Sequence, residues 1–347
     1  MPSSATGAAA LDHGALHDYL TRELGSGGGR PLKVEQFSGG QSNPTFRLEW
    51  GGKAYVLRKK PAGVLLPSAH AVEREFRVMR ALHGSEVPVP QALALCQDAE
   101  VIGTPFYLME LVEGRLFWDP SLPEQTEAER ASIYEEVLRV IAALHRVDCA
   151  AVGLADFGKP GNYFARQFDR WSRQYRASET EHLPDMEAVV EALPGRLPDS
   201  GEMRLVHADY RLDNLIFHPT QPRIAAVIDW ELSTLGDPLA DLATHCVAWH
   251  LPRRYWGLAD VPLAGSGLPT ERDYCARYCA LTGRERIEDW PALVAFALFR
   301  KAAINQGIVK RAQQGNASSA KALDITRVRH IASVARTLLE QPASLKD

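Results

Sequence analysis

The feature that most constrains the fold is a β-rich stretch in the middle of an otherwise helical second half. The run RLVHADYRLDNLIF, followed by RIAAVIDW, reads as apolar strands that end in polar loops. The loops carry His207, Asp209, Asn214, Asp229 and Glu231. Strands that deliver acidic and amide side chains to loops on a helical scaffold are a typical place for an active site. The stretch therefore predicts where the chemistry of this chain lies.

The rest of the chain divides into a strand-rich first part and a helical second part. Strands are expected at Leu32–Phe37, Thr45–Trp50, Ala54–Lys59, Ala92–Cys96 and Phe106–Leu111. Helices are expected at Leu16–Leu24 and from an N-cap at Ser68 to Leu82. From Thr126 onward, apolar residues recur at helical spacing. The pattern predicts an α+β protein with a small antiparallel sheet in residues 1–112 and a larger, mainly helical lobe in residues 113–347.

The polar loop residues match what phosphoryl transfer requires. This reaction needs a carboxylate to orient the acceptor hydroxyl and take its proton, and oxygen ligands for Mg²⁺. Asp209 is the expected catalytic base, and Asn214 and Asp229 are the expected metal ligands. His207, two residues before the base, is expected to orient the loop by hydrogen bonding.

The same residues carry a resemblance to a known family. HADYRLDN, Asp229 fifteen residues after Asn214, and the run GDPLADLA from Gly236 resemble the signature of the aminoglycoside phosphotransferase and choline kinase superfamily. The resemblance implies a two-lobed protein-kinase-like fold, ATP and Mg²⁺ as cofactors, and a small-molecule hydroxyl as the acceptor. After the HADYRLDN loop, Asp229-Trp-Glu231 takes the place where a protein kinase carries its DFG segment, and the chain contains no APE segment, which argues against a protein kinase.

The first lobe is expected to bind the nucleotide. Small residues between the first two strands let backbone N–H groups approach phosphates. Val56 and Arg58 share one face of the third strand, so Val56 would cover adenine while Arg58 contacts phosphate. The backbone C=O of Glu110 and N–H of Val112, in a segment that resembles the connector between lobes, are expected to bond adenine. The residues expected in the phosphate loop are Ser38, Gly39, Gly40, Gln41, Ser42 and Asn43.

A helix glutamate is expected to hold the phosphate-binding cation. Similarity to the VERE segment of the aminoglycoside enzymes selects Glu75, with Glu73 as the alternative. Arg58 stands where many relatives carry lysine. Arginine keeps its charge and binds phosphate in a fork, but Lys59 and Lys60 remain open as the phosphate contact.

One branch of the superfamily is especially similar. The segment VLRKKPAGVLLPSAHAVEREFRVMRAL resembles the kinase-like domains that are fused to acyl-CoA dehydrogenase domains in animal acyl-CoA dehydrogenase family members 10 and 11, and their stand-alone bacterial relatives. The resemblance extends over about Val34 to Arg336 and implies a hydroxyacyl-CoA or hydroxy acid as acceptor. No dehydrogenase activity is expected, because no length for a flavin domain remains.

The distribution of charge points to the same kind of acceptor. Residues 251–347 carry 15 basic and 9 acidic side chains, although the whole chain has a net charge of -4. An enzyme for polycationic aminoglycosides should be acidic where the acceptor binds. The basic tail favours an anionic acceptor, and a solvated basic face is the alternative. The expected contacts are Arg300, Lys301, Lys310 and Arg311.

Composition excludes several other classes. The net charge of -4 gives no basic field for nucleic acid or a membrane surface, and no apolar stretch is expected to reach membrane-spanning length. Five cysteines without metal-site pairing, and a start without a signal-peptide pattern, favour a reducing, cytoplasmic setting. The rival hypotheses are a nucleotide-binding module without turnover and an aminoglycoside- or choline-type kinase.

Overall fold

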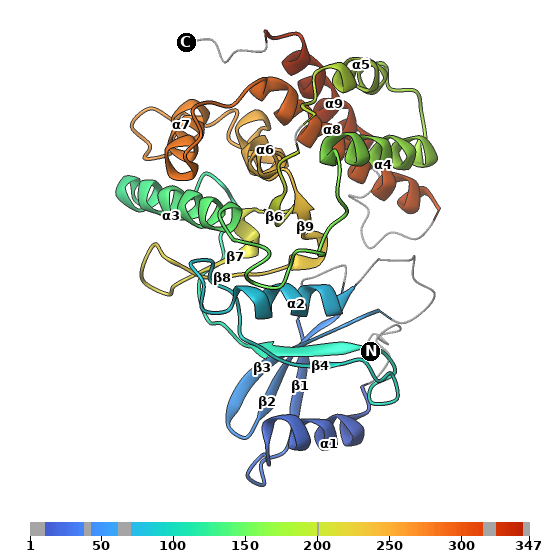
Figure 1. The fold of residues 1–347 in the computed structure, drawn as a ribbon, viewed down its shortest axis with the longest axis vertical. Helices are drawn as coiled ribbons and strands as arrows, with labels where there is room; N and C mark the ends of the chain where they lie inside the picture. Colours follow the sequence, from blue (N-terminus) through green and yellow to red (C-terminus); the bar gives the residue numbers. More distant parts are fainter. Residues whose placement is uncertain (1–10, 38–42, 62–70, 200, 315–323, 343–347) are drawn as a thin grey trace, which may run out of the picture. The chain divides into compact units, whose positions relative to one another are not determined.

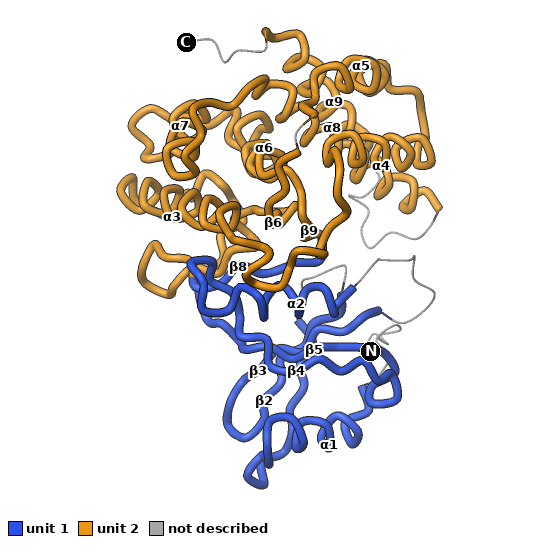
Figure 2. The backbone as a smooth tube through the Cα atoms, in the orientation of Figure 1, with its two compact units in different colours: residues 1–114, 225–231 blue, residues 115–224, 232–347 orange. Residues whose placement is uncertain are grey.

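A computed structural model describes residues 11–37, 43–61, 71–199, 201–314 and 324–342 of the chain. It divides into two compact units (Figure 2). Unit 1 consists of residues 1–114 and 225–231, and unit 2 of residues 115–224 and 232–347. The expected lobes, 1–112 and 113–347, therefore differ from the observed units mainly at residues 225–231. This segment joins unit 1, where the Val227 N–H donates to the Pro88 carbonyl at 2.8 Å.

Unit 1 is built on an antiparallel five-stranded sheet with the order β1-β2-β3-β5-β4 (Figure 1). Gly51 and Gly52 connect β2 to β3, with φ angles of 61° and 84°. Two successive residues with positive φ suit the tight hairpin turn, and glycine adopts that backbone without strain. The strands are β1 Lys33–Gln36, β2 Thr45–Trp50, β3 Lys53–Lys59, β4 Ala92–Cys96 and β5 Phe106–Glu110.

The two faces of this sheet have different coverings. Helix α1 (His13–Leu24) begins where the Asp12 side chain accepts the Gly14 and Ala15 N–H groups, and it buries Leu16 and Leu20 against one face. Leu57 of β3 belongs to that core. Because side chains alternate along a strand, Arg58 points to the other face. Helix α2 (Val72–Leu82) covers this second face.

The start of α2 differs from the expectation. The helix begins at Val72, after an Ala71 N-cap that makes no side-chain hydrogen bond, so the expected start at Ser68 is wrong by one turn. Ser68 itself lies outside the described residues. The helix is held by packing instead, because Val72, Phe76, Val78, Met79 and Leu82 are buried.

Unit 2 is mainly helical and centres on α8. This helix packs against α4, α6 and α9 (Figure 1). The expectation that no apolar stretch reaches membrane-spanning length is wrong, since α8 is long and apolar enough, but 78% of that window is buried inside the protein. It serves here as a core helix. The helices are α3 Glu127–His145, α4 Tyr163–Ser178, α5 Pro184–Ala192, α6 Pro238–His250, α7 Glu271–Thr282, α8 Trp290–Gln313 and α9 Ile325–Leu339. Short 3₁₀ turns lie at Leu193–Gly195, Leu212–Asn214, Trp230–Leu232 and Arg253–Tyr255.

Short strands support the polar loops among these helices. Strand β6 (Arg204–Val206) pairs antiparallel with β9 (Thr234–Gly236), a strand that the sequence pattern did not indicate. A Cβ atom on Gly236 would lie 2.6 Å from the Tyr163 ring, so only glycine fits there. A hairpin joins β7 (Leu215–Phe217) to β8 (Ile224–Val227), and the chain enters unit 1 within β8.

Candidate active site

The loop after β6 is held in an unusual conformation by a buried carboxylate. Ala208 has a φ of 64°, in the left-handed region that alanine rarely adopts. The N–H groups of His207 and Ala208 donate to the two carboxylate oxygens of Asp241 at 2.7 and 2.8 Å. These two bonds hold the strained turn, and such strain is typical of functional loops.

Asp241 lies in the first turn of α6 and is itself supported. His145 Nε2 lies 3.3 Å from its Oδ2, and His145 Nδ1 is 2.7 Å from the Tyr278 hydroxyl. Burial alone would raise the pKa of Asp241, but its bonds to His145 and to the loop hold that pKa below the ordinary value. The sequence analysis quoted the GDPLADLA run without assigning this residue a role. An aspartate beyond the Asp-Pro start of a helix was the available signal.

The predicted catalytic residues of unit 2 lie together on this loop. The Asp209 N–H donates to His207 Nδ1 at 3.2 Å, so the histidine orients the loop as a hydrogen-bond acceptor. The Asn214 side-chain nitrogen donates to the Asp209 carbonyl at 2.9 Å and to its carboxylate at 3.2 Å. With the amide nitrogen engaged in this way, the amide oxygen of Asn214 is the atom suited to bind a cation.

Unit 1 contains a second cluster, centred on Arg58. Its guanidinium lies 3.1 Å from the Glu75 carboxylate, 2.5 Å from Asp229 and 3.6 Å from Glu231. Burial raises the pKa of Glu75 to about 7. The positive charge of Arg58 lowers this pKa, whereas the negative charges of Asp229 and Glu231 raise it further. Burial would lower the pKa of Arg58, but the three carboxylates outweigh it and raise that pKa. Glu231 was given no role by the sequence analysis.

Asp229 lies at the end of β8 with a φ of 66°. Aspartate is one of the few residues that adopt this backbone readily. The indole N–H of the buried Trp230 donates to the Val227 carbonyl at 2.9 Å, which closes the turn behind the carboxylate. The turn thus presents Asp229 to Arg58.

The alternatives to Arg58 and Glu75 have other partners. Lys60 pairs with Glu73 at 2.9 Å. Lys59 is buried, and by strand alternation it points to the face opposite Arg58. Of the three basic residues, Arg58 is therefore the one that the structure joins to the helix glutamate.

The other predicted nucleotide contacts are described only in part. Asn43 is buried and donates its side-chain N–H to Glu75 at 2.9 Å. Val56 is buried on the same sheet face as Arg58, Glu110 ends β5, and Val112 follows two residues later. The remaining residues of the predicted phosphate loop, Ser38, Gly39, Gly40, Gln41 and Ser42, lie outside the described part of the chain.

The cluster in unit 1 has the composition of a magnesium site. Three carboxylates surround one guanidinium, so negative charge exceeds positive charge, and the donors are hard oxygen atoms. Asp229, one of the two ligands that the sequence predicts, belongs to this cluster, so the carboxylates of unit 1 fit a divalent cation. Asn214, the other predicted ligand, lies in unit 2.

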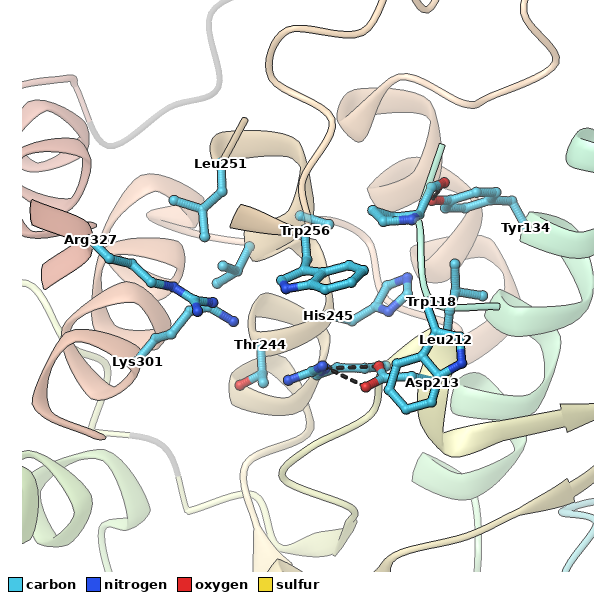
Figure 3. Close-up of a pocket in the computed structure, with 14 residues that line it drawn as sticks. Trp118, Tyr134, Leu212, Asp213, Thr244, His245, Leu251, Trp256, Lys301 and Arg327 are labelled. Atoms are coloured by element: carbon cyan, nitrogen blue, oxygen red, sulfur yellow. Dashed lines mark hydrogen bonds and ion pairs between the residues drawn. The ribbon is translucent and has the colours of Figure 1, made fainter. Parts of the chain in front are cut away.

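Unit 2 contains a pocket beside the catalytic loop (Figure 3). Arg211, Asp213, Lys301 and Arg327 line its polar side, and Trp118, Tyr134, Leu251 and Trp256 contribute apolar surface. Of the four basic residues expected to contact an acceptor, only Lys301 lines this pocket. Arg300 lies over the Trp171 ring at 5.5 Å, Lys310 donates to the Ala177 carbonyl at 2.6 Å, and Arg311 is exposed in the last turn of α8.

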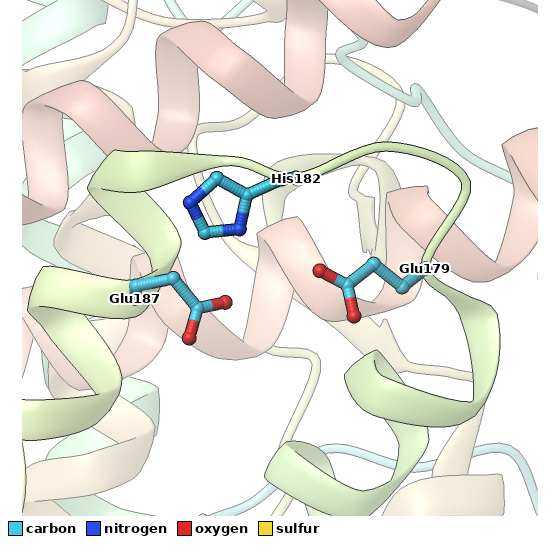
Figure 4. A group of neighbouring side chains, drawn as sticks. All are labelled: Glu179, His182 and Glu187. Carbon is cyan, nitrogen blue, oxygen red and sulfur yellow. The ribbon is translucent and has the colours of Figure 1, made fainter.

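A third group of polar side chains lies elsewhere in unit 2. Glu179, His182 and Glu187 gather near the end of α4 (Figure 4). Arg176 donates to both carboxylate oxygens of Glu187 at 2.5 Å and lowers the pKa of that carboxyl. Because this carboxylate already has a cationic partner, the group is explained as a surface ion-pair cluster.

Comparisons with known proteins agree with this geometry. Residues 33–290 match the model of the Phosphotransferase enzyme family. Mouse acyl-CoA dehydrogenase family member 10 is 48% identical over 316 residues, which cover 90% of this chain and 30% of that protein. Human acyl-CoA dehydrogenase family member 11 is 40% identical over 321 residues, which cover 89% of this chain and 40% of that protein. The chain thus spans less than half the length of these relatives.

Solved structures give the same result. A Ralstonia eutropha protein is 49% identical with a TM-score of 0.86, and the match covers 95% of this chain and 99% of that one. The aminoglycoside phosphotransferase APH(4)-Ia, in ternary complex with ADP and hygromycin B, is 17% identical with a TM-score of 0.62, covering 94% and 100%. At that identity the match shows the fold alone. The expected resemblance and the α+β kinase-like fold are confirmed.

Proposed function

The chain belongs to the Phosphotransferase enzyme family, and from this membership we propose that it is an ATP- and Mg²⁺-dependent kinase of a small-molecule hydroxyl. The acceptor that we propose is a hydroxy acid or its coenzyme A thioester. Similarity to acyl-CoA dehydrogenase family members over about nine tenths of the chain supports an acceptor from acyl metabolism.

The geometry supplies a role for each residue in this reaction. The acceptor oxygen attacks the γ-phosphorus, the bond to the β-phosphate oxygen breaks, and ADP leaves. Asp209 orients the acceptor hydroxyl and takes its proton. His207 and Asn214 fix Asp209 by the hydrogen bonds described above. When bound, Mg²⁺ would neutralise phosphate charge, with Asn214 and Asp229 as its protein ligands.

In unit 1, Arg58 would bind the phosphates of ATP through its planar guanidinium. The carboxylate of Glu75, on α2, lies 3.1 Å from the Arg58 guanidinium and holds it in place. The Asn43 side-chain N–H donates to the same carboxylate. The pairing keeps the cation oriented before the nucleotide arrives, so less side-chain entropy is lost on binding.

One observation carries the proposal of catalysis. Asp241 fixes a left-handed turn immediately before Asp209, and Asn214 is bonded to Asp209 from the other side. A module that only bound nucleotide would not need a carboxylate held in this way on the loop of unit 2.

The test is ATP consumption in a coupled assay with Mg²⁺ and a panel of hydroxy acids, hydroxyacyl-CoA thioesters and aminoglycosides. Asp209→Ala should lower kcat by at least about 10³-fold, because the base and its supports act as a unit. Asp169→Ala is the matched control, since Asp169 forms an exposed helical ion pair with Arg173. Equal activity of the two variants would refute the role of Asp209, and turnover of hygromycin B alone would refute the proposed acceptor.

A further inference from the structure

The pocket in unit 2 is lined by a half-buried arginine, Arg327, whose hydrogen-bonding capacity is not fully used. Arg327 Nε is buried and has no hydrogen-bond acceptor among the described residues. Its guanidinium carbon lies 5.6 Å from the centre of the Tyr255 ring, which contributes an attraction but accepts no conventional hydrogen bond. A buried donor without an acceptor is costly and needs an explanation, and a ligand that binds there would supply one.

Lys301 adds a second positive charge to the same pocket. In the part of the chain that the structure describes, no carboxylate lies within ion-pair distance of its ammonium. Burial, followed by repulsion from Arg211 and Arg327, lowers the pKa of Lys301 to about 8, despite the attraction of Asp209 and Asp213. Figure 3 shows Lys301 and Arg327 side by side on neighbouring helices.

The other charged groups of the pocket do not remove this excess. Arg211 already binds both carboxylate oxygens of Asp213, at 3.0 and 2.6 Å. His245 also lines the pocket, but burial lowers its pKa to about 4, so it is neutral at physiological pH. One carboxylate therefore faces three cations, and the pocket favours an anion.

We propose that Lys301 and Arg327 bind the anionic group of the phosphoryl acceptor and select for acceptors that carry one. This inference rests on the proposed function and assigns its acceptor specificity to two residues. Arg211 and Asp213, which line the same pocket, follow Asp209 by two and four residues on the catalytic loop, so the pocket adjoins the proposed base. An acceptor anchored by its anionic end would then present a hydroxyl to Asp209.

The apolar side of the pocket fits the rest of such a molecule. The exposed fractions of Trp118 and Trp256 are 60% and 51%, which is large for indole side chains. Trp256 also has a φ of 63°, a backbone conformation that bulky residues rarely adopt, where it ends the 3₁₀ turn Arg253–Tyr255. These two indoles offer a surface for a short hydrocarbon chain between the anion and the solvent.

The cavity is large enough for a small anionic group. Its volume is about 60 Å³, several times the roughly 10–15 Å³ that one water molecule needs on the same measure. A single carboxylate or phosphate group therefore fits. The carboxylate of a free hydroxy acid is the group that we propose, and the phosphates of a coenzyme A thioester are the other source of the same charge.

The decisive experiment measures binding by calorimetry, independently of turnover. The probes are 4-hydroxybutyrate, 4-hydroxybutyryl-CoA and the neutral butane-1,4-diol, each with wild type, Lys301→Met, Arg327→Met and Lys310→Met. Lys310 is the matched control, because it lies on the same helix and donates to the Ala177 carbonyl. The Kd of the free acid should rise about tenfold to hundredfold for Lys301→Met and Arg327→Met, as expected for a lost charge-assisted hydrogen bond, and stay unchanged for Lys310→Met.

Each outcome decides a separate question. If only the thioester loses affinity, its phosphates are the anion and the cation pair still binds it. Equal losses for the neutral diol, unchanged affinities, or no binding of either anionic probe to wild type overturn the proposal. Binding that is retained while no probe is phosphorylated refutes the proposed kinase activity but leaves the anion site standing. Lys301→Arg should restore affinity, and thermal unfolding of every variant shows that it folds.

Discussion

Replacement of Asp241 by asparagine should separate the positioning of Asp209 from the general stability of unit 2. The carboxylate is 2% exposed and accepts the N–H groups of His207 and Ala208, one on each oxygen. Asparagine has the same shape, but only one of its two terminal atoms accepts a hydrogen bond. The variant therefore keeps one bond and turns an N–H group of the amide toward a backbone N–H.

The magnitude follows from these contacts. One charge-assisted hydrogen bond is worth about 1.5–3 kcal/mol, and a buried donor left without an acceptor costs about 1–3 kcal/mol. The strained backbone at Ala208 stores a further 1–3 kcal/mol or so, which the loop releases if it relaxes. We expect the free energy of unfolding to fall by about 3–5 kcal/mol and kcat to fall by about 10²-fold, since a displacement of 1 Å costs about that much.

The assay pairs urea denaturation with steady-state kinetics. Asp237→Asn is the control, because Asp237 is also buried near the start of α6 and its side chain caps that helix by accepting the Leu239 N–H, at 2.8 Å. It should cost roughly 1 kcal/mol or less, as asparagine also caps helices, and should leave kcat nearly unchanged. The KM for ATP should stay the same in both variants. A normal kcat in Asp241→Asn would refute the reasoning, even if stability falls.

Three further predictions follow from other contacts. Arg58→Met leaves the buried carboxylate of Glu75 without its cation, so the free energy of unfolding should fall by about 3–5 kcal/mol in denaturant titrations, whereas an unchanged midpoint would contradict the ion-pair geometry. Gly236→Ala places a Cβ 2.6 Å from the Tyr163 ring and should cost about 1–3 kcal/mol by the same assay, and a neutral result would show that the ring moves freely. The folded-state pKa of Lys301, about 8, lies below the ordinary 10.5, so the unfolded chain binds more protons in that interval and stability should rise as pH increases through it. Lys301→Met should flatten this rise, and an identical pH profile in the variant would exclude Lys301 as its source.

Much of unit 1 follows from local patterns. Alternation of apolar residues predicts β2 with its observed bounds, because a half-buried strand repeats every two residues, and the short apolar run ALALC coincides with β4. Because side chains alternate along β3, Arg58 lies on the sheet face opposite to that of Leu57. The Leu57 side chain is buried in the core that the sheet forms with α1. The start of α2 was missed because its helix is held by packing and has no side-chain cap, and such a start leaves no local signal.

The candidate site shows the same division between local and distant information. The spacing of His207, Asp209 and Asn214 within one loop was sufficient to predict that they act together, since their mutual hydrogen bonds span at most five residues. Asp241 reaches the same loop across 34 residues of sequence, and only the packing of α6 against β6 brings it there.

The pocket of unit 2 depended most on the tertiary structure. The excess of basic residues after residue 250 was visible in the sequence, and it predicts an anionic acceptor. Which cations face the pocket was decided by how α8 and α9 pack: Lys301 and Arg327 meet there, whereas Arg300 stacks on Trp171 and Lys310 bonds to α4. Composition and spacing determine which chemical groups a chain carries, but the direction in which a helical side chain points depends on what its neighbours bury.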